Sequence, residues 1–143
     1  MKSTGETLVG FCRREGACMG ITYRIDADEG LIRSRFEGEL TLEQIKEHSL
    51  RIRREAAFHK GLRELAEVGN ISPRLTPQDI LGFTDWLNSL EPFRAIAVVC
   101  RDDLSFGLAR MFSTLMARSV QDVEAFRDMD TAVRWLDSLP VSD

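Results

Sequence analysis

The sequence predicts a single-domain α/β protein with a mixed, mostly parallel sheet of about five strands, about four helices and the order β-β-α-β-α-β-α-β-α. Apolar and polar residues alternate between residues 20 and 37, which predicts two half-buried strands in a hairpin. Amphipathic helical segments then alternate with short apolar segments. The continuously apolar run at residues 95–100 is typical of a central strand that is covered on both faces.

The length and composition suit one folded domain. The chain has 143 residues, of which 43% are apolar and 29% charged, and an ordinary domain has roughly 100–150 residues. Residues 1–19 show no helical or strand periodicity, so we interpret them as an N-terminal tail or leader and expect the domain to span residues 20–139.

The opening hairpin leads into a helix. One side of the second strand carries Ile32, Ser34 and Phe36. Thr41 and Gln44 then have the spacing of a capping box at a helix start. The helix that follows is expected to place one apolar stripe on the sheet.

The remaining elements follow from turn and capping signals. Residues 61–68 suit a helix by spacing but a strand by length and flanking glycines, and the α/β alternation favours the strand. Residues 69–76 are expected to form a loop, and Thr76 with Pro77 begins the second helix. Asp102 or Asp103 is expected to cap the third helix. Residues 120–127 form the last predicted strand, and Asp128 or Asp130 caps the last helix.

Charge and hydropathy argue against several classes of partner. The chain has 19 Lys and Arg against 23 Asp and Glu, a net charge of −4, so nucleic acid is not expected as a partner. The longest apolar run is residues 95–100, whereas a membrane-spanning helix needs roughly 20 residues, so we expect no membrane span. Residues 1–10 lack the features of a secretory signal, and a cytoplasmic location is expected. Three cysteines without metal-binding spacing predict neither a disulfide framework nor a metal site.

No catalytic motif stands out, so we expect no catalytic residues and no cofactor. The two histidines, His48 and His59, are interpreted as surface or helix-end residues. If one helix runs through both, they are too far apart to share a metal ion. Glycine-rich phosphate loops and a nucleophile elbow are missing from the sequence.

The junction between the apolar strand and the third helix is the strongest candidate for ligand binding. In open α/β sheets, ligands bind at the carboxyl ends of the strands, where helix N-termini and arginines are able to hold an anion. A helix-capping aspartate and a glycine required by close packing would explain the same residues. The aromatic and thioether groups of this helix suit an apolar pocket, a dimer seam or the core. The candidate ligand-binding residues are Arg101, Ser105, Phe106, Gly107, Arg110 and Met111.

Several segments together carry a family resemblance. They are Ile21 to Gly38, Phe58 to Glu67, Arg94 to Val99, Phe106 to Phe112, and Val123 to Asp128 followed by Ala132 to Leu136. Together they resemble the small bacterial STAS/SEC14-like (SpoIIAA-like) proteins over residues 20–137. The resemblance implies a fold like that of anti-sigma-factor antagonists and, more distantly, of lipid-carrying SEC14 domains.

The resemblance implies a binding role. The leading hypothesis is a non-enzymatic binding or regulatory module that acts through a protein partner or through self-association as a homodimer. The alternative is a SEC14-like carrier of a small apolar or amphiphilic ligand. A third hypothesis is an enzyme that uses Asp102, Asp103 or Glu67 as acid or base. In the antagonists, the loop after the third strand holds a phosphorylated serine, and Ser72 is the corresponding candidate, although it lacks the following Ser-Gly.

Overall fold

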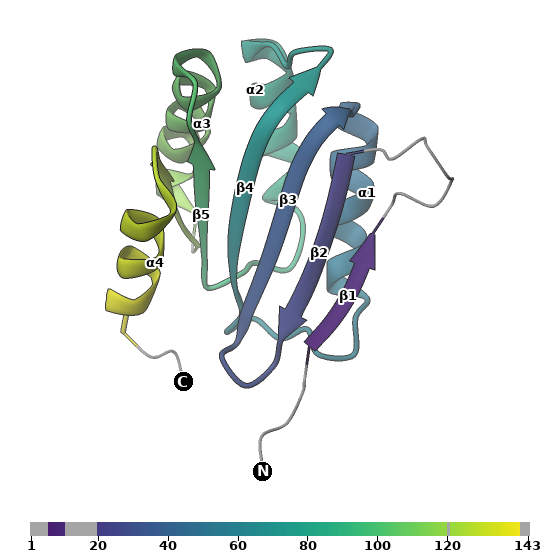
Figure 1. The fold of residues 1–143 in the computed structure, drawn as a ribbon, viewed down its shortest axis with the longest axis vertical. Helices are drawn as coiled ribbons and strands as arrows, with labels where there is room; N and C mark the ends of the chain where they lie inside the picture. Colours follow the sequence, from purple (N-terminus) through teal and green to yellow (C-terminus); the bar gives the residue numbers. More distant parts are fainter. Residues whose placement is uncertain (1–5, 11–19, 120, 141–143) are drawn as a thin grey trace.

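The structure is a computed structural model that describes residues 6–10, 20–119 and 121–140, without the side chains of residues 6–10 and 118. One six-stranded sheet contains the strands in sequence order, with helices on both faces (Figure 1). The strands are β1 (Glu6–Gly10), β2 (Gly20–Asp26), β3 (Leu31–Glu39), β4 (Arg63–Ser72), β5 (Ala95–Cys100) and β6 (Asp122–Phe126). The helices are α1 (Leu42–Arg53), α2 (Pro77–Leu87), α3 (Asp103–Leu115) and α4 (Met129–Ser138), with a 3₁₀ turn, η1 (Met116–Arg118).

The sheet is antiparallel at one end and parallel over the rest. Strands β1, β2 and β3 pair antiparallel, and β3 to β6 pair parallel. The predicted hairpin is present, with Tyr23 opposite Ser34 and Ile21 opposite Phe36. Its turn contains Gly30 at a φ of 63°, a backbone conformation that favours glycine. The order of elements predicted from residue 20 onward is therefore confirmed.

The structure adds strand length in two places. Strand β1 lies within residues 1–19, where the sequence predicts no element, and its backbone pairs with β2 at the sheet edge. The predicted loop at residues 69–76 is wrong in its first half, because β4 continues to Ser72. Beyond a register shift between Phe36 and Gly38, the end of β4 still pairs with β3. Ile71 and Ser72 pair with Gly38 and Glu39, so the strand continues past Gly69 and Asn70, which lie at the shift and by themselves favour a turn.

Side chains cap all four α-helices at the expected positions. Thr41 and Thr76 form capping boxes with the third helical residue, at α1 and α2. Asp102 accepts a hydrogen bond from the backbone N–H of Ser105, and Asp128 accepts one from that of Thr131, each at 2.8 Å. Of the alternatives left open by the sequence, Asp102 and Asp128 are therefore the N-caps.

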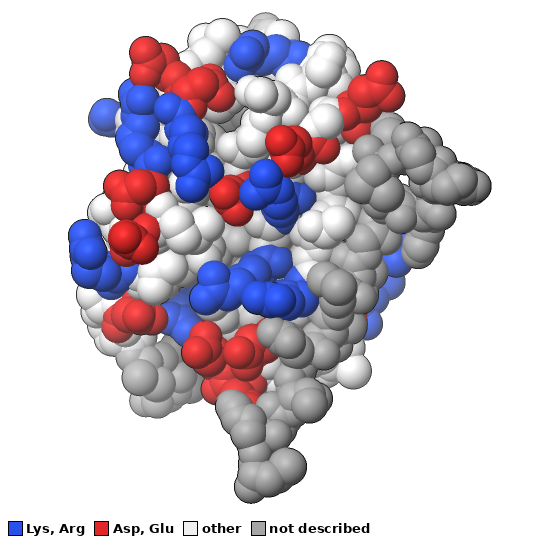
Figure 2. Space-filling view, in the orientation of Figure 1, with Lys and Arg blue, Asp and Glu red and all other residues white. Residues whose placement is uncertain are grey.

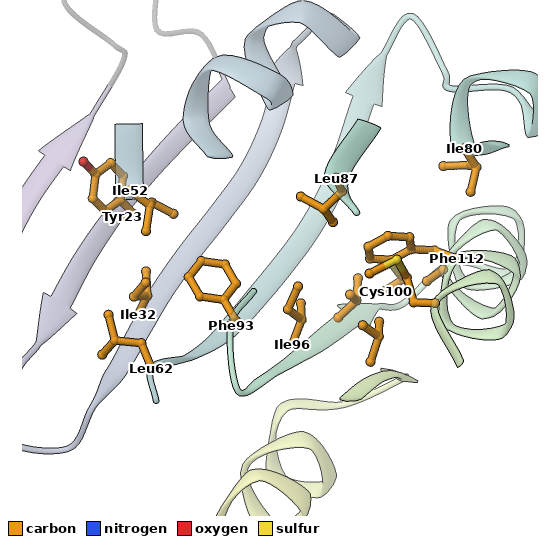
Figure 3. Close-up of a cluster of buried hydrophobic side chains, with 14 of the residues drawn as sticks. Tyr23, Ile32, Ile52, Leu62, Ile80, Leu87, Phe93, Ile96, Cys100 and Phe112 are labelled. Atoms are coloured by element: carbon orange, nitrogen blue, oxygen red, sulfur yellow. The ribbon is translucent and has the colours of Figure 1, made fainter. Parts of the chain in front are cut away.

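Two apolar layers hold the helices on the sheet. Helices α1, α2 and α3 cover one face and enclose the larger cluster of buried side chains, which Figure 3 shows in part, including Tyr23, Phe93, Ile96 and Phe112. On the opposite face, α4 packs through Ala132 and Leu136 against β3, β4 and β5. Strand β5 is buried at every position, as expected for a strand that is covered on both faces.

The face that carries α4 is partly open and charged. Arg33, Arg35 and Glu67 occupy outward positions on β3 and β4, and charges of both signs mingle on this side (Figure 2). Arg35 contacts Glu37 at 2.8 Å and Glu67 at 3.0 Å. Exposed pairs of this kind contribute little to stability. The larger apolar cluster lies on the other face of the sheet.

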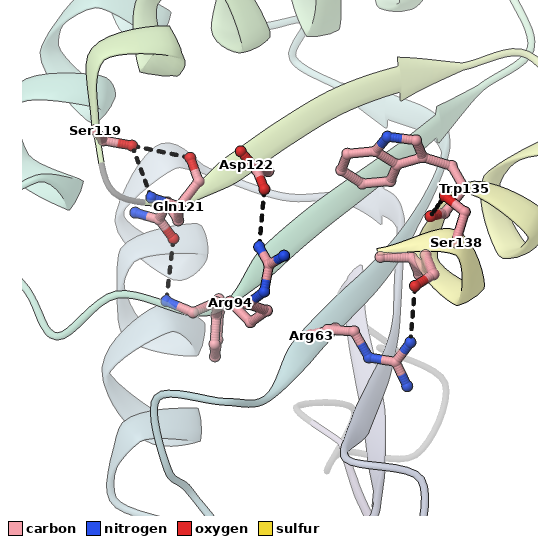
Figure 4. A network of polar contacts seen from close by, with 9 residues as sticks. Arg63, Arg94, Ser119, Gln121, Asp122, Trp135 and Ser138 are labelled. Carbon is pink, nitrogen blue, oxygen red and sulfur yellow. Dashed lines mark hydrogen bonds and ion pairs between the residues drawn. The ribbon is translucent and has the colours of Figure 1, made fainter. Parts of the chain in front are cut away.

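A polar network ties the segment before β5 to the start of β6 and the residue before it (Figure 4). Arg94 pairs with Asp122 at 2.8 Å, and the backbone N–H of Phe93 donates to Oε1 of buried Gln121 at 3.1 Å. On the other face of the sheet, Arg63 donates to the carbonyl of Leu136 in α4 at 3.0 Å. These contacts fix the amino ends of the parallel strands and the position of the Phe93 ring beneath α1.

The interpretation that Gly107 is required by close packing is wrong, because a Cβ built on it meets nothing within 4 Å. We expect Gly107→Ala to stabilise the protein by about 0.5–1 kcal/mol, since alanine loses less backbone entropy in a helix. The measurement is the midpoint and slope of urea unfolding. Gly30→Ala is the control and should destabilise, because φ is 63° there. A lower midpoint for Gly107→Ala would contradict this account of α3.

Candidate functional site

A partly open cavity of about 160 Å³ lies between helices α1, α2 and α3 and strands β3, β4 and β5. Most of its lining is apolar, including Phe83, Phe93 and Phe112. Arg74 and Leu75, in the segment between β4 and α2, belong to the lining, and the Arg74 side chain is half exposed. The polar lining residues are His48, Ser49, Glu64, Arg74, Cys100 and Ser105.

Strand β4 lines the cavity over much of its length. Glu64, Ala66, Val68 and Ile71 of this strand all line it. A strand rises about 3.3 Å per residue, so these positions span on the order of 20 Å. Glu64 lies near the amino end of β4, and Ile71 lies near its carboxyl end. This row of mostly apolar side chains offers contacts to the apolar chain of an amphiphile.

A buried polar cluster of Ser34, His48 and Glu64 adjoins the amino end of this cavity. Ser34 Oγ donates to Glu64 Oε2 at 2.6 Å, and His48 Nε2 lies 3.1 Å from the same oxygen. The three residues are 2–7% exposed. The rings of Tyr23 and Phe36 flank His48 edge-on, with centroids 5.3 and 5.1 Å away. The imidazole is thus held by packing as well as by hydrogen bonds.

The cluster keeps Glu64 ionised despite its burial. Burial by itself raises the pKa of this carboxyl, but the hydrogen bond and the charge of His48, the hydrogen bond from Ser34 and the charge of Arg53 outweigh that effect and lower it. Arg53 in turn donates to the carbonyls of Ser49 and Glu91 at 2.8 and 2.7 Å. Its guanidinium stacks over the Phe93 ring at 4.6 Å. A buried carboxylate therefore stands beside a largely apolar space.

The cluster does not have the geometry of an activated serine nucleophile. In such a site the serine hydroxyl donates to the imidazole, and the carboxylate contacts the other ring nitrogen. Here Ser34 Oγ lies closer to Glu64 Oε2 than to His48 Nε2, which is 3.4 Å away, and His48 Nε2 contacts the same carboxylate oxygen. Burial also raises the pKa of the Cys100 thiol to about 12, so this lining residue is protonated at neutral pH.

Two hydrogen-bonding positions of the cluster remain unused. His48 Nδ1 is buried and has no hydrogen-bond partner among the described residues. Both hydrogen bonds to the Glu64 carboxylate go to Oε2, which leaves Oε1 without a donor in the described part of the chain. Unpaired buried polar atoms are rare in folded proteins. His48 Nδ1 is such an atom, whereas Glu64 Oε1 is not among the buried unpaired atoms. Glu64 lines the cavity, so a bound molecule is able to donate a hydrogen bond to Oε1.

The candidate residues from the sequence lie around the start of α3. Of these, Ser105 lines the cavity. Arg101 pairs with Glu67 at 3.0 Å, and its side chain is 60% exposed. The Phe106 ring lies under the guanidinium of Arg127, at 4.3 Å. The other three are not lining residues: Gly107 and Arg110 are exposed, and Met111 packs against the core.

The carboxylates considered for acid-base chemistry are engaged elsewhere. Hydrogen bonds from Ser105 lower the pKa of Asp102, and a hydrogen bond from Arg101 lowers the pKa of Glu67. Asp103 pairs with Arg127 at 2.7 Å, with its side chain 93% exposed. Helix capping and exposed ion pairs explain these three residues.

The other residues singled out from the sequence lie on the surface, in the core or outside the described residues. Ser72 is exposed at the end of β4, so its phosphorylation stays a prediction. His59 is exposed, as expected, whereas the surface interpretation of His48 is wrong. Cys12 and Cys18 lie outside the described residues. Within the described residues, no cluster of His, Cys, Asp or Glu is arranged to hold a metal ion, and no helix has the length and apolar character to cross a membrane.

Sequence reasoning missed the polar cluster, although a signal was present. Ser34 stands on the apolar side of its strand, between Ile32 and Phe36. Glu64 has the same parity as Ala66 and Val68, which places a carboxylate on the buried side of β4. Polar residues on the apolar sides of two neighbouring strands indicate a buried polar cluster, because such groups require partners.

The fold and the cavity define a class: an α/β domain that encloses a mostly apolar space between three helices and a mixed sheet. The chain belongs to the SpoIIAA-like family, which matches residues 31–137. A solved structure of an uncharacterised protein of the DUF3478 family from Shewanella loihica PV-4, with a SpoIIAA-like fold, is 15% identical. The match covers 95% of this chain and 98% of that one, with a TM-score of 0.49. No curated protein matches this chain.

The lowered pKa of Glu64 predicts an acid-dependent loss of stability. Because the folded pKa lies below the unfolded value, near 4.5, the stabilising contribution is complete above that value and is lost as the pH falls through the folded pKa. We expect Glu64→Gln to lower the free energy of unfolding at pH 7 by about 2 kcal/mol, since hydrogen bonds to a charged group weaken. Urea titrations between about pH 7 and 3 should show this difference shrinking in acid.

The control for this measurement is Glu124→Gln, an exposed change on β6. It should alter stability by less than about 0.5 kcal/mol at every pH. A wild-type advantage over Glu64→Gln that stays constant down to pH 3 would contradict an ionised Glu64 in the folded protein.

Proposed function

We propose that this protein binds a small apolar or amphiphilic molecule in the cavity between α1, α2, α3 and the sheet, as a carrier or sensor without catalytic turnover. The observation that carries the proposal is the cavity itself, with its volume of about 160 Å³ and its largely apolar lining. An apolar cavity of about 150 Å³ is sufficient to bind benzene. An empty cavity lowers the stability of a protein, because the side chains around it lose van der Waals contacts. A ligand that fills the cavity restores such contacts.

The position and chemistry of the cavity support this function. It extends toward the carboxyl ends of β3, β4 and β5, where ligands bind in open α/β sheets. Its lining combines a long apolar wall with one buried carboxylate, Glu64. Ligand sites typically have this composition, with few polar groups that fix orientation. The distant resemblance to lipid-carrying SEC14 domains points the same way.

A protein partner or a homodimer is the second candidate function. Leu81 on α2 and Leu104 on α3 are large apolar side chains that are 44% and 57% exposed. Both belong to helices that enclose the cavity, so a partner bound there would be able to respond to a ligand. Single exposed leucines are common on protein surfaces, and for this reason the cavity ranks above them.

Native mass spectrometry separates the two functions. Protein purified from a bacterial cytoplasm is compared under native and denaturing conditions. Extra mass that is lost on denaturation supports the carrier and gives the mass of its ligand. A dimer without extra mass supports self-association.

Filling the cavity tests the carrier directly. Ala109 lines the cavity and is 7% exposed, so we expect Ala109→Phe to reduce the affinity for n-octanol at least about tenfold, by occupying its space. Calorimetric titration measures the affinity, and thermal unfolding reports whether the variant folds. If Ala109→Phe unfolds, Ala109→Leu tests the same position with a smaller side chain.

The matched control is Ala117→Phe, which adds the same ring at an exposed position. It should bind n-octanol as wild type does. Equal affinities for wild type, Ala109→Phe and Ala109→Leu, all of them folded, would show that the cavity is not the binding site.

A further inference from the structure

We propose that the cavity selects an uncharged amphiphile with a hydroxyl head group, and that this hydroxyl donates a hydrogen bond to Glu64 at the amino end of β4. This inference rests on the proposed function, since it names the chemical class of the ligand bound in the same cavity. It begins from the two unused hydrogen-bonding atoms of the buried cluster, Glu64 Oε1 and His48 Nδ1.

The hydrogen-bonding roles at the cluster favour a donor on the ligand. The Glu64 carboxylate already accepts from Ser34 and lies 3.1 Å from His48 Nε2, which donates to it. An ionised carboxylate only accepts hydrogen bonds, so a ligand group that pairs with Oε1 has to donate. When Nε2 carries the proton of a neutral imidazole, Nδ1 is also an acceptor.

The charges around the cluster disfavour an ionised head group. Glu64 is 7% exposed, and a carboxylate ligand beside it would place two negative charges in a space with little water. An ammonium head group would lose its hydration on entering the cavity. The charge of Arg53 already interacts with Glu64, so a second cation would gain less from this carboxylate. A hydroxyl satisfies the acceptor at a much smaller desolvation cost.

The lining of the cavity indicates where the apolar part of the ligand would lie. From Glu64, the lining continues along β4 through Ala66 and Val68 to Ile71. An extended alkyl chain with its hydroxyl at Glu64 would follow this row toward the carboxyl ends of the strands. Opposite the row, Leu108 and Phe112 of α3 also line the cavity. These side chains offer apolar contacts along the chain.

The test compares three probes of similar length: n-octanol, methyl heptyl ether and octanoate. The ether has the same number of heavy atoms as the alcohol but lacks the donor. Hydrogen bonds to charged groups contribute about 1.5–3 kcal/mol, so we expect n-octanol to bind at least about tenfold more tightly than the ether. Octanoate should bind more weakly than n-octanol, measured by calorimetric titration at neutral pH.

Two variants show whether Glu64 is responsible. Glu64→Gln turns an amide N–H toward the position of Oε1 if its oxygen keeps the bonds from Ser34 and His48. Since both n-octanol and the ether accept hydrogen bonds, their affinities should become nearly equal. Glu67→Gln is the matched control, because Glu67 lies on the same strand but faces the other side of the sheet. This control should keep the preference for the alcohol.

The outcomes separate the two proposals. Equal binding of n-octanol and the ether to wild type overturns the hydroxyl inference and leaves the proposed function standing. Tighter binding of octanoate also overturns it, in favour of a charged His48. Binding of none of the three probes, with no effect of Ala109→Phe on stability, would count against the cavity as a ligand site altogether.

Discussion

The burial of the Glu64 carboxylate is the constraint on which the helical face of this domain depends. An ionised carboxylate inside a protein is tolerated only when it is paired and hydrogen-bonded. Its partners are three residues from two elements: Ser34 on β3, His48 on α1 and, by charge, Arg53 further along α1. Helix α1 therefore has one position on the sheet in which the carboxylate is satisfied. Purely apolar packing would fix that position less sharply, since similar apolar contacts form in neighbouring registers.

The same constraint explains why the cavity adjoins the cluster. Helix α1 is held over β3 and β4 by the cluster, whereas α3 packs over β5 and β6 through Ala109 and Phe112. Small residues face the space between them, Ala66 on β4 and Ala109 on α3. Neither side chain reaches far from its backbone, so the space along β4 stays unfilled. The cavity thus follows from two well-fixed helices and two alanines.

The sequence predicted the architecture well and the site poorly, for different physical reasons. Strand alternation at residues 20–37 and the caps at Thr41, Thr76, Asp102 and Asp128 are local signals, and the structure confirms them. The end of β4 depends on backbone pairing with β3, which no local pattern encodes. The cluster joins residues 30 positions apart in the chain, Ser34 and Glu64, and their contact follows only from the parallel register of β3 and β4. A motif search for catalysis passes over such a site because each residue by itself is unremarkable.

The helix N-termini at the carboxyl edge of the sheet add a last argument about the kind of ligand. Free N–H groups at a helix start attract anions, and the sequence interpretation relied on this property near Arg101. In the structure, side chains of Thr41, Thr76 and Asp102 already accept hydrogen bonds from these groups at α1, α2 and α3. Asp102 also adds a negative charge there, with a lowered pKa that keeps it ionised. An anion would therefore meet the Asp102 charge and only partly free donors at this edge, and the Glu64 carboxylate inside, whereas an uncharged apolar molecule is repelled by neither charge.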